Sequence, residues 1–425
     1  MSLSNSVKTH LIDPAVHNNS RTEFRLDDAF WASSMRLVDL GMYNPNCATD
    51  TGLYYPSILG VMAAVKKLTL YSGGTIIDEI QELPSWASIQ HLRTSNQGSE
   101  DINRFELLNG MGLQLTSEDN WSFDADTDYK QLYGNNNQAR LHNQFQIAAE
   151  SDDQTSGAVS LADYLGLLKS NPVLPKIPEL RLIVDWNRTA SDYVADDDAP
   201  NNPGGAQTYT PIRPTLIADE LVGVPEGQAQ DFKLPFLANI VERHVVAAAD
   251  AGAAVGDAKR QSFRSSAFRN RYVKDLTFFN KVTTDDGWMT AKQRSPCQRG
   301  EVLQLVVNGQ KYLPDQGIDQ EAQKLQYFND TMGSLNLPAP AFYESLTDTS
   351  GRVLATGDRS QPSNQLVGNF SVTSVRVEDN IDRLDVEYTR QKTGTAGKDA
   401  AFTLLCFGRC AKQLEVRNGQ VRISY

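Results

Sequence analysis

The sequence predicts an all-β protein made of two tandem β-sandwiches. Short runs rich in Val, Leu, Phe and Tyr are separated by Gly, Asn, Asp and Pro, and few segments have helical periodicity. Two segments also read alike, VKKLTLYSGGTIIDEI at 65–80 and VLQLVVNGQKYLP at 302–314. Because 425 residues exceed what a single hydrophobic core usually supports, we expect one sandwich unit to be present twice.

Both similar segments contain a turn suited to a β-hairpin. Apolar and polar residues alternate up to Ser72-Gly73-Gly74 in the first segment and up to Asn308-Gly309 in the second. Hairpin turns of this length need positive φ angles, which glycine and asparagine accept most readily. Both segments are therefore predicted to be hairpins.

A second pair of similar segments lies upstream of the hairpins. Residues 23–44 resemble residues 262–280, and the offset between matching residues stays at 236 to 239 in both pairs. A nearly constant offset indicates an internal duplication. The residues expected at equivalent positions are Phe24 with Phe263, Asp39 with Asp275, and Leu68 with Leu305.

Each copy is predicted to consist mainly of short strands bounded by turn residues. This pattern is typical of antiparallel sandwiches and differs from the alternation of strands and helices in α/β proteins. We expect two tandem jelly-roll β-sandwiches with a few short inter-strand helices, the first at 1–235 and the second at 240–425. The candidate strands are TEFRLDD, SSMRLVDLGM, VKKLTLY, TIIDEI and LRLIVDWNR in the first copy, and YVKDLTFFNKV, VLQLVVN, QKYLP, NFSVTSVRV, RLDVEYTRQ, FTLLCFG and KQLEVRNGQVRISY in the second.

Two segments show helical features. In residues 160–170, Ser160 precedes Asp163 as in a capping box, and apolar residues recur at helical spacing until Asn171-Pro172 ends the pattern. Residues 234–257 begin as a helical pattern and continue into small residues and glycine. The second segment is predicted to be a bridge between the two copies.

Composition and charge narrow the classes of function. No apolar run reaches the roughly 18 residues of a membrane helix, and the first residues have no secretory pattern, so we expect an intracellular site of synthesis. A formal charge of −12 argues against a protein that wraps nucleic acid. Cys406 and Cys410 are spaced too far apart on a strand to form a disulfide, and we expect both to be reduced.

The sequence contains none of the usual catalytic motifs. Its five histidines form no metal-binding pattern, and no nucleophile elbow, P-loop or dinucleotide-binding motif is present. The acidic run Asp196-Asp197-Asp198 offers oxygen ligands for calcium but matches no EF-hand, and a solvated loop is the favoured interpretation. We expect no catalytic residues, no bound metal, no cofactor and no enzymatic activity.

One basic stretch differs from the acidic remainder of the chain. Between residues 259 and 274 there are six basic residues, no acidic residue and two interleaved phenylalanines. Such a stretch can be an assembly contact between subunits, a nucleic-acid contact or a solvated strand face. The candidate assembly residues are Lys259, Arg260, Arg264, Arg269, Arg271 and Lys274.

In the order and local sequence of several segments, the chain resembles the double jelly-roll major capsid proteins of Polinton-like viruses, virophages and their relatives. The resemblance extends over most of residues 20–425. The segments that carry it are LGVMAAVKKLTLYSGGTIIDEIQELPSWASIQHL, SLADYLGLLKSNPVLP, LRLIVDWN, VVNGQKYLPDQGI, YFNDTMGSLNLP and LEVRNGQVRISY.

This resemblance implies a structural protein of the virion. Two jelly rolls per chain would give a homotrimer with six sandwiches, whose nearly hexagonal outline tiles an icosahedral shell. The implied partners are further copies of the chain, neighbouring capsomers, a penton protein and minor capsid proteins, without specific nucleic-acid binding.

Two other classes of function share the predicted fold. A two-jelly-roll enzyme acting on glycans would gather acidic and aromatic residues in one cleft, and a glycan-binding sandwich would expose tryptophans. Because a fold alone does not decide function, these alternatives remain open at this point.

Overall fold

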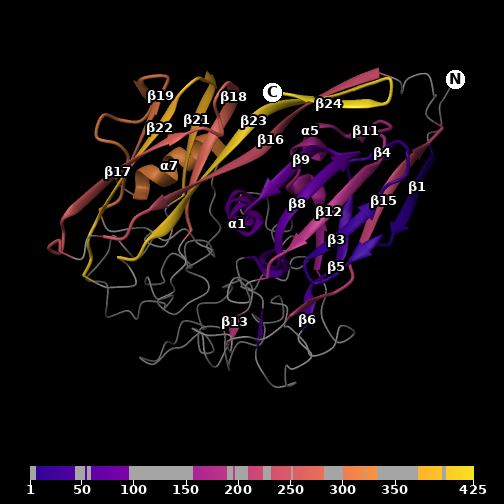
Figure 1. The fold of residues 1–425 in the computed structure, drawn as a ribbon, viewed down its shortest axis with the longest axis horizontal. Coiled ribbons are helices and arrows are strands. Elements are labelled where there is room, and N and C mark those ends of the chain that lie inside the picture. The colour runs from indigo at the N-terminus through magenta and orange to yellow at the C-terminus, as the bar shows by residue number, and fades with distance from the viewer. Residues whose placement is uncertain are drawn as a thin grey trace.

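The structure is a computed structural model of the 425-residue chain. It describes residues 6–43, 53–54, 59–94, 157–188, 195–196, 209–223, 231–249, 252–281, 300–319, 321–332, 372–394 and 399–425. Two β-sandwiches lie side by side, with the strands of residues 6–222 in one and most strands of residues 231–424 in the other (Figure 1). No helix in the described ranges is long and apolar enough to cross a membrane.

Sandwich 1 is formed by two sheets, which we name 1A and 1B. Sheet 1A has the order β10-β5-β15-β4-β11, with β1 added beside β15, and sheet 1B has the order β2-β3-β12-β8-β9. The strands of 1A are β10 (Gly157–Ser160), β5 (Arg36–Leu40), β15 (Thr215–Val222), β4 (Trp31–Ala32), β11 (Val173–Leu174) and β1 (Ser6–Ile12). Those of 1B are β2 (Val16–His17), β3 (Arg21–Arg25), β12 (Leu180–Trp186), β8 (Val65–Ser72) and β9 (Thr75–Gln81).

Sandwich 2 repeats this arrangement in sheets 2A and 2B. Sheet 2A has the order β16-β23-β18-β21, with β24 beside β23, and sheet 2B has the order β17-β22-β19-β20. The strands of 2A are β16 (Asp231–Val246), β23 (Phe402–Arg417), β18 (Arg271–Lys281), β21 (Thr373–Ile381) and β24 (Gln420–Ser424). Those of 2B are β17 (Ala258–Ser265), β22 (Leu384–Gln391), β19 (Val302–Val307) and β20 (Gln310–Lys311).

Short helices and two small strand pairs complete the described structure. The pairs are β7 with β13 and β6 with β14. The remaining elements are β6 (Met42–Tyr43), β7 (Leu53–Tyr54), β13 (Ala195–Asp196), β14 (Thr210–Pro211), η1 (Gly60–Ala64), η3 (Leu161–Asp163), α1 (Leu83–Thr94), α5 (Gly166–Ser170) and α7 (Glu321–Met332).

The two hairpins occupy equivalent strands, but the predicted residue match is displaced. In sheet 1B, Leu182 pairs with both Phe24 and Leu70, and in sheet 2B, Val386 pairs with both Phe263 and Leu305. Phe24 and Phe263 are therefore equivalent as predicted, whereas the residue equivalent to Leu305 is Leu70 and not Leu68. A displacement of two residues leaves every side chain on the same face of the sheet, so the alternating pattern could not reveal it.

The match between Asp39 and Asp275 holds at the level of the strand. β5 and β18 each lie next to the central strand of their sheet, and both carry a register shift at or beside the aspartate. Their environments differ: Asp39 is exposed with a φ of 60°, whereas Asp275 is buried. The two residues therefore share a position in the fold but not a role.

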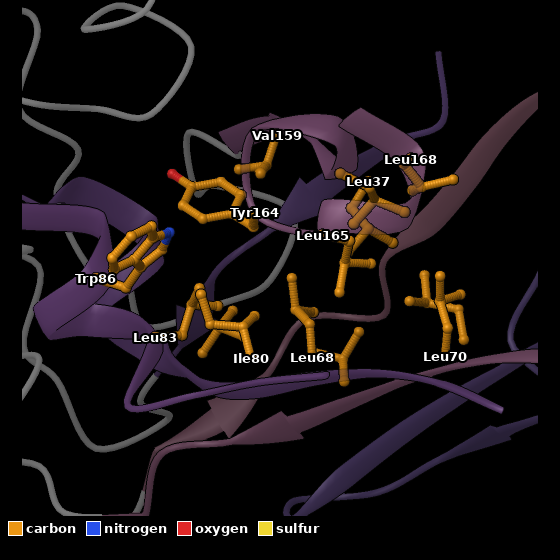
Figure 2. Close-up of a cluster of buried hydrophobic side chains, with 14 of the residues drawn as sticks. Leu37, Leu68, Leu70, Ile80, Leu83, Trp86, Val159, Tyr164, Leu165 and Leu168 are labelled. Carbon is orange, nitrogen blue, oxygen red and sulfur yellow. The ribbon is translucent and has the colours of Figure 1, made fainter. Parts of the chain in front are cut away.

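Each sandwich has its own packed interior. In sandwich 1, side chains from β5, β8, β9, β10 and α5 meet between the sheets (Figure 2). Leu37, Leu68, Leu70, Leu165 and Leu168 are all at most 1% exposed. In sandwich 2 the corresponding cluster joins sheets 2A and 2B and contains the free, buried thiols of the two cysteines expected to be reduced, Cys406 and Cys410.

Residues 234–246 form a strand, and the prediction of a helical bridge there is wrong. They belong to β16, whose side chains alternate between more and less buried along residues 231–238. The run contains Ile240, Val241, Val245 and Val246, and such β-branched side chains favour extended backbone. Pro235 is tolerated because β16 is the end strand of the main path of sheet 2A.

The helix predicted over residues 160–170 is interrupted. A 3₁₀ turn (η3) and the short α5 are separated by Leu165, whose backbone is extended, and Ser160 makes no side-chain cap hydrogen bond. The interruption brings Gly166 against β16, where a Cβ atom would lie 1.8 Å from the carbonyl oxygen of Leu237. Tertiary packing therefore overrides the local helical pattern, and only the end of the helix at Asn171 was predicted correctly.

The half of the β16–β23 pair formed by residues 231–238 and 410–417 extends over sandwich 1. There β23 is flanked by β16 and β24, and this three-stranded extension packs on the sandwich 1 core through Leu234, Phe236, Leu414 and Val416. Figure 1 shows the extension crossing above β9 and α5. At its base, Lys412 donates to the carbonyl oxygen of Ile77 at 3.1 Å.

A buried carboxylate lies beneath this extension. Asp78 on β9 is 1% exposed, and one of its oxygens accepts the backbone N–H of Leu167 at 2.9 Å. Burial raises the pKa of Asp78 to about 6, although this hydrogen bond and the charge of Lys412 act in the opposite direction. The contact between β9 and α5 therefore contains a group that titrates near neutral pH.

We expect Asp78 to make the stability of the protein depend on pH. The folded-state pKa lies above the unfolded value of about 3.9, so its contribution is fully present below about pH 4 and is lost as pH rises through about 6. Relative to Asp78→Asn, the wild type should lose on the order of 3 kcal/mol of unfolding free energy across this window. Denaturant titrations of both proteins at several pH values measure the difference, and parallel pH curves would contradict it.

Candidate assembly surface

The basic stretch predicted from the sequence lies on β17, the following turn and the start of β18. Lys259, Arg260 and Arg264 are on β17, Arg269 is in the turn, and Arg271 and Lys274 are on β18. The sequence did not reveal β17 as a strand. The six residues are therefore distributed over two strands of different sheets in sandwich 2.

The three basic residues of β17 are held by their own chain. Arg260 forms an ion pair with Glu387, and Arg264 pairs with Asp385 at 3.0 Å. Lys259 donates to the carbonyl oxygen of Ala248 at 3.3 Å. The acidic partners come from β22, more than 120 residues away in sequence, so the absence of acids within the stretch did not predict unpaired charge.

The pKa of Asp385 shows that the basic charge of β17 is compensated within the chain. Burial works against ionisation, but hydrogen bonds from Arg264 and Arg383 hold the pKa of Asp385 below its ordinary value. The Arg264 side chain is nevertheless 67% exposed, and pairs of this kind contribute only about 0–1 kcal/mol. Arg260 and Arg264 therefore join β17 to β22 by exposed ion pairs, and most of each arginine side chain remains accessible to solvent.

Of the other three basic residues, one contacts an aromatic ring of the same chain, and two make no ion pair with described residues. The guanidinium of Arg271 lies 4.0 Å from the ring centroid of Tyr425, a cation–π contact that holds the C-terminal residue at the base of the β23–β24 extension. Within the described part of the chain, the side chains of Arg269 and Lys274 make no ion pair. Arg269 is exposed in the turn, so it is the member of the stretch best placed to reach another molecule.

The contact between the two sandwiches shows how one sandwich can bury the surface of another. The outer face of sheet 2A presents Phe279, Leu405 and Phe407, which are at most 1% exposed because sandwich 1 covers them. Trp86 of α1 packs against Phe407 with ring centroids 5.3 Å apart. An apolar patch of sheet 2A is thus buried under a helix of the other sandwich.

Charged residues surround this apolar patch. Glu82, at the start of α1, accepts hydrogen bonds from Arg243 at 2.8 Å and from Lys281 at 2.6 Å. Burial opposes ionisation of Glu82, but these two cations hold its pKa below the ordinary value. The inter-sandwich contact therefore combines an apolar centre with ion pairs at its border, as protein–protein interfaces do.

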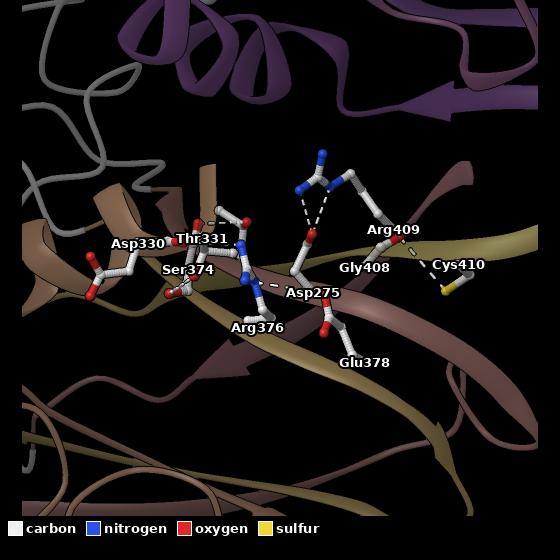
Figure 3. Close-up of polar contacts among 10 residues, drawn as sticks. Asp275, Asp330, Thr331, Ser374, Arg376, Glu378, Gly408, Arg409 and Cys410 are labelled. Atoms are coloured by element: carbon white, nitrogen blue, oxygen red, sulfur yellow. Dashed lines mark hydrogen bonds and ion pairs between the residues drawn. The ribbon is translucent and has the colours of Figure 1, made fainter. Parts of the chain in front are cut away.

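A bidentate ion pair within sheet 2A lies close to the same contact. The Nε of Arg409 donates to both carboxylate oxygens of Asp275, at 2.7 and 2.8 Å (Figure 3). Asp275 is 3% exposed at its side chain and Arg409 16%. The pair joins β18 to β23 on the face that also presents Phe407, and no local sequence pattern predicts that these residues meet.

One cluster of Ser, His and Glu side chains in the described residues lacks the order of a catalytic triad. Ser265 donates to Glu242, and His244 lies 3.9 Å from the same carboxylate, so the histidine does not lie between the other two groups as a catalytic triad requires. No group of three His, Cys, Asp or Glu side chains in the described ranges could hold a metal ion. Of the acidic run considered for calcium, Asp197 and Asp198 lie outside the described residues.

Sequence reasoning missed the apolar residues exposed on sheet 1A. On β1, Val7 is 59% exposed and Leu11 is 74% exposed. Their neighbours across the ladder, Leu221 and Ile217 on β15, lie on the same outer face. The sequence of this strand, SVKTHLI, has no regular alternation of apolar and polar residues, so the apolar row becomes apparent only from the fold.

Comparison with solved structures establishes the fold. The chain is similar to VP54 of PBCV-1 as fitted into a reconstruction of the virophage Sputnik, with a TM-score of 0.58 and 10% identity over 99% of this chain and 97% of that chain. It is similar to the mavirus major capsid protein, with a TM-score of 0.54 and 12% identity over 100% and 90% of the two chains. The 3.5 Å structure of the Sputnik virophage matches with a TM-score of 0.55 and 12% identity over 100% and 89%.

The fold is therefore the predicted double jelly roll, and the similar structures come from viral capsids. Neither a protein-family model nor a curated protein matches the sequence.

We expect the loss of one partner of the buried Asp275–Arg409 pair to destabilise sheet 2A strongly. Arg409→Met leaves a buried carboxylate unpaired and should lower the unfolding free energy by about 3–5 kcal/mol. Arg417→Met, on the same strand but 62% exposed, should change it by less than about 1 kcal/mol. Denaturant unfolding of both variants measures the contrast, and equal losses would show that burial of the pair has no special effect.

Proposed function

We propose that the protein is a major capsid protein that forms homotrimers, and that these trimers tile an icosahedral virus shell. The observation that carries this proposal is the pair of equivalent jelly rolls fixed side by side in one chain. Three such chains around a threefold axis present six sandwiches with a nearly hexagonal outline, which packs into a flat array. The likeness to viral capsid structures over nearly the whole chain supports the same role.

In this function the protein is structural and performs no catalysis. Its partners are copies of itself, then neighbouring capsomers, together with a penton protein at the fivefold vertices and minor capsid proteins. Its place is the virion, after synthesis and assembly inside the host cell. The charge of −12 is consistent with a shell protein without specific nucleic-acid binding.

The glycan-directed alternatives receive less support from the described structure. Three of the five tryptophans lie in it, and Trp31, Trp86 and Trp186 are each 2% exposed. A glycan-binding platform uses exposed aromatic rings, so these three cannot supply one. The capsid function is therefore the better supported of these functions.

The oligomeric mass of the purified protein tests the proposal most directly. We expect light scattering coupled to size-exclusion chromatography to give three times the chain mass of 47.0 kDa. Negative-stain electron microscopy should then show particles with a pseudo-hexagonal outline. If the protein is a monomer even at high concentration, the capsid function in the form proposed is contradicted.

The basic stretch provides a second test, of the assembly contact. We expect the double variant Arg269→Glu, Arg271→Glu to weaken trimer or shell formation while each sandwich stays folded. Because Arg271 also contacts Tyr425, the single variant Arg269→Glu isolates the intermolecular effect. One exposed pair is worth only about 0–1 kcal/mol, so the effect depends on its repetition around the oligomer.

Light scattering and circular dichroism measure both effects, with Lys66→Glu as the control. That variant reverses an exposed charge on β8 of sandwich 1. If Arg269→Glu assembles as the control does, Arg269 lies outside the contact.

A further inference from the structure

Sandwich 2 contains a buried cluster of polar side chains that the capsid function does not use. Asn280, Glu301, Lys324 and Tyr388 are each at most 5% exposed. Charged and amide side chains are rarely buried to this extent, because direct partners must replace the water that they lose. Asn280 is on β18 of sheet 2A, Glu301 directly precedes β19 and Tyr388 is on β22 of sheet 2B, and Lys324 is on α7.

The alternation of side chains along the strands directs Asn280 and Glu301 into the interior of sandwich 2. Asn280 follows Leu276 and Phe278 at two-residue spacing, and both of these belong to the apolar cluster between the sheets. Glu301 precedes Leu303 of the same cluster at the same spacing. Because side chains two residues apart on a strand lie on one face, a carboxylate and an amide meet between sheets 2A and 2B.

Helix α7 brings a lysine to the same place. The helix packs on β21, where the hydroxyl of Thr331 donates to the carbonyl oxygen of Ser374 at 3.0 Å (Figure 3). Lys324 lies one turn before Phe328 on one side of α7, and these side chains are 1% and 0% exposed. The buried side of the helix therefore directs the lysine into the protein and away from solvent.

Glu301 binds both nitrogen-containing side chains, one with each carboxylate oxygen. Its Oε1 accepts a hydrogen bond from Nδ2 of Asn280 at 3.1 Å, and its Oε2 lies 3.1 Å from Nζ of Lys324. Nδ2 of Asn280 also donates to the hydroxyl of Tyr388 at 3.3 Å. A lysine amine and an asparagine amide are thus held on one carboxylate, which can carry a proton from one nitrogen to the other.

This arrangement meets the chemical requirements for joining an amine to an amide. The amine attacks the amide carbon only after it has lost a proton, and the amide nitrogen leaves only after it has gained one. A carboxylate hydrogen-bonded to both nitrogens can perform both transfers. Burial favours the first transfer, because it converts an ion pair into two neutral groups in a place without hydration. The fold also holds the two reactants together and keeps water, the competing nucleophile, away.

We propose that Lys324 and Asn280 form an isopeptide bond after the chain has folded, with Glu301 as the group that transfers protons. Nζ of Lys324 bonds to Cγ of Asn280, and the bond between Cγ and Nδ2 breaks. The lysine ammonium loses two protons: one ends on Nδ2, which leaves as ammonia, and the other stays on Glu301.

The reaction requires no oxidant, metal or second substrate. It occurs once in each chain and turns over no substrate, so it is compatible with a purely structural protein and does not depend on the proposed function. The product joins α7 covalently to β18 of sheet 2A. The side chains of one sandwich thereby become a permanent cross-link through its core.

Peptide mass spectrometry of the denatured, trypsin-digested wild type tests the bond directly. We expect peptide 275–281 to be joined to the peptide that begins at residue 312, with no cleavage after Lys324. The linked species should be lighter than the two separate peptides together by about 17 Da, the mass of ammonia. If the folded wild type gives only separate peptides and normal cleavage after Lys324, the proposal is overturned, and this result needs no variant.

Variants separate the roles of the three residues. Lys324→Arg supplies no attacking amine, and Glu301→Gln cannot accept the proton, so neither should give linked peptides. Asn280→Asp should still link but lose water, about 18 Da, and give a product of the same mass as the wild type. The matched control is Lys311→Arg, at a lysine on β20 that is 51% exposed, which should link as completely as the wild type.

Circular dichroism checks that each variant is folded before its peptides are compared. Linked peptides in Glu301→Gln at the wild-type level would overturn the role of Glu301 in proton transfer. Linkage of peptide 275–281 in Lys324→Arg would overturn the assignment of Lys324 as the attacking amine.

Discussion

The arrangement of the two sandwiches depends on the pairing of β16 with β23. One half of this pair completes sheet 2A, and the other half continues over sandwich 1 with β24 at its side. Since the same ladder belongs to both packing surfaces, the sandwiches cannot rotate relative to each other without breaking main-chain hydrogen bonds. This ladder sets the orientation of the two sandwiches. The close approach of Gly166 to Leu237 and the ion pairs of Glu82 stabilise the same orientation.

Strands with local signals were predictable, and those defined by distant partners were not. The alternation in β8 and β12 and the glycine turn after β8 are properties of neighbouring residues, so the hairpins and their equivalence followed from the sequence. β16 was mistaken for a helix because its stability comes from β23, about 170 residues away. β17 was noticed only for its charge, since its pairing with β22 depends on a strand beyond any local window.

The candidate assembly residues show the same division. Composition identified the six basic residues, but only the fold shows that Glu387 and Asp385 compensate Arg260 and Arg264, which leaves Arg269 as the exposed member without an ion pair in the described structure. The outer face of β1 was missed for a related reason. The sequence of β1 does not distinguish its two faces, and the sheet that the strand joins determines which face is exposed to solvent.

The length of the β16–β23 ladder has a mechanical consequence. Each of these two antiparallel strands has 16 residues, and they run obliquely along the long axis of the molecule (Figure 1). A force that pulls the sandwiches apart along the strands loads many hydrogen bonds at once in shear, whereas a force across them would open the bonds one after another. The chain should therefore resist stretching along its length much more strongly than peeling at its edge. A flat sheet of such molecules would be stiff in its plane, which is where internal pressure acts on a closed shell.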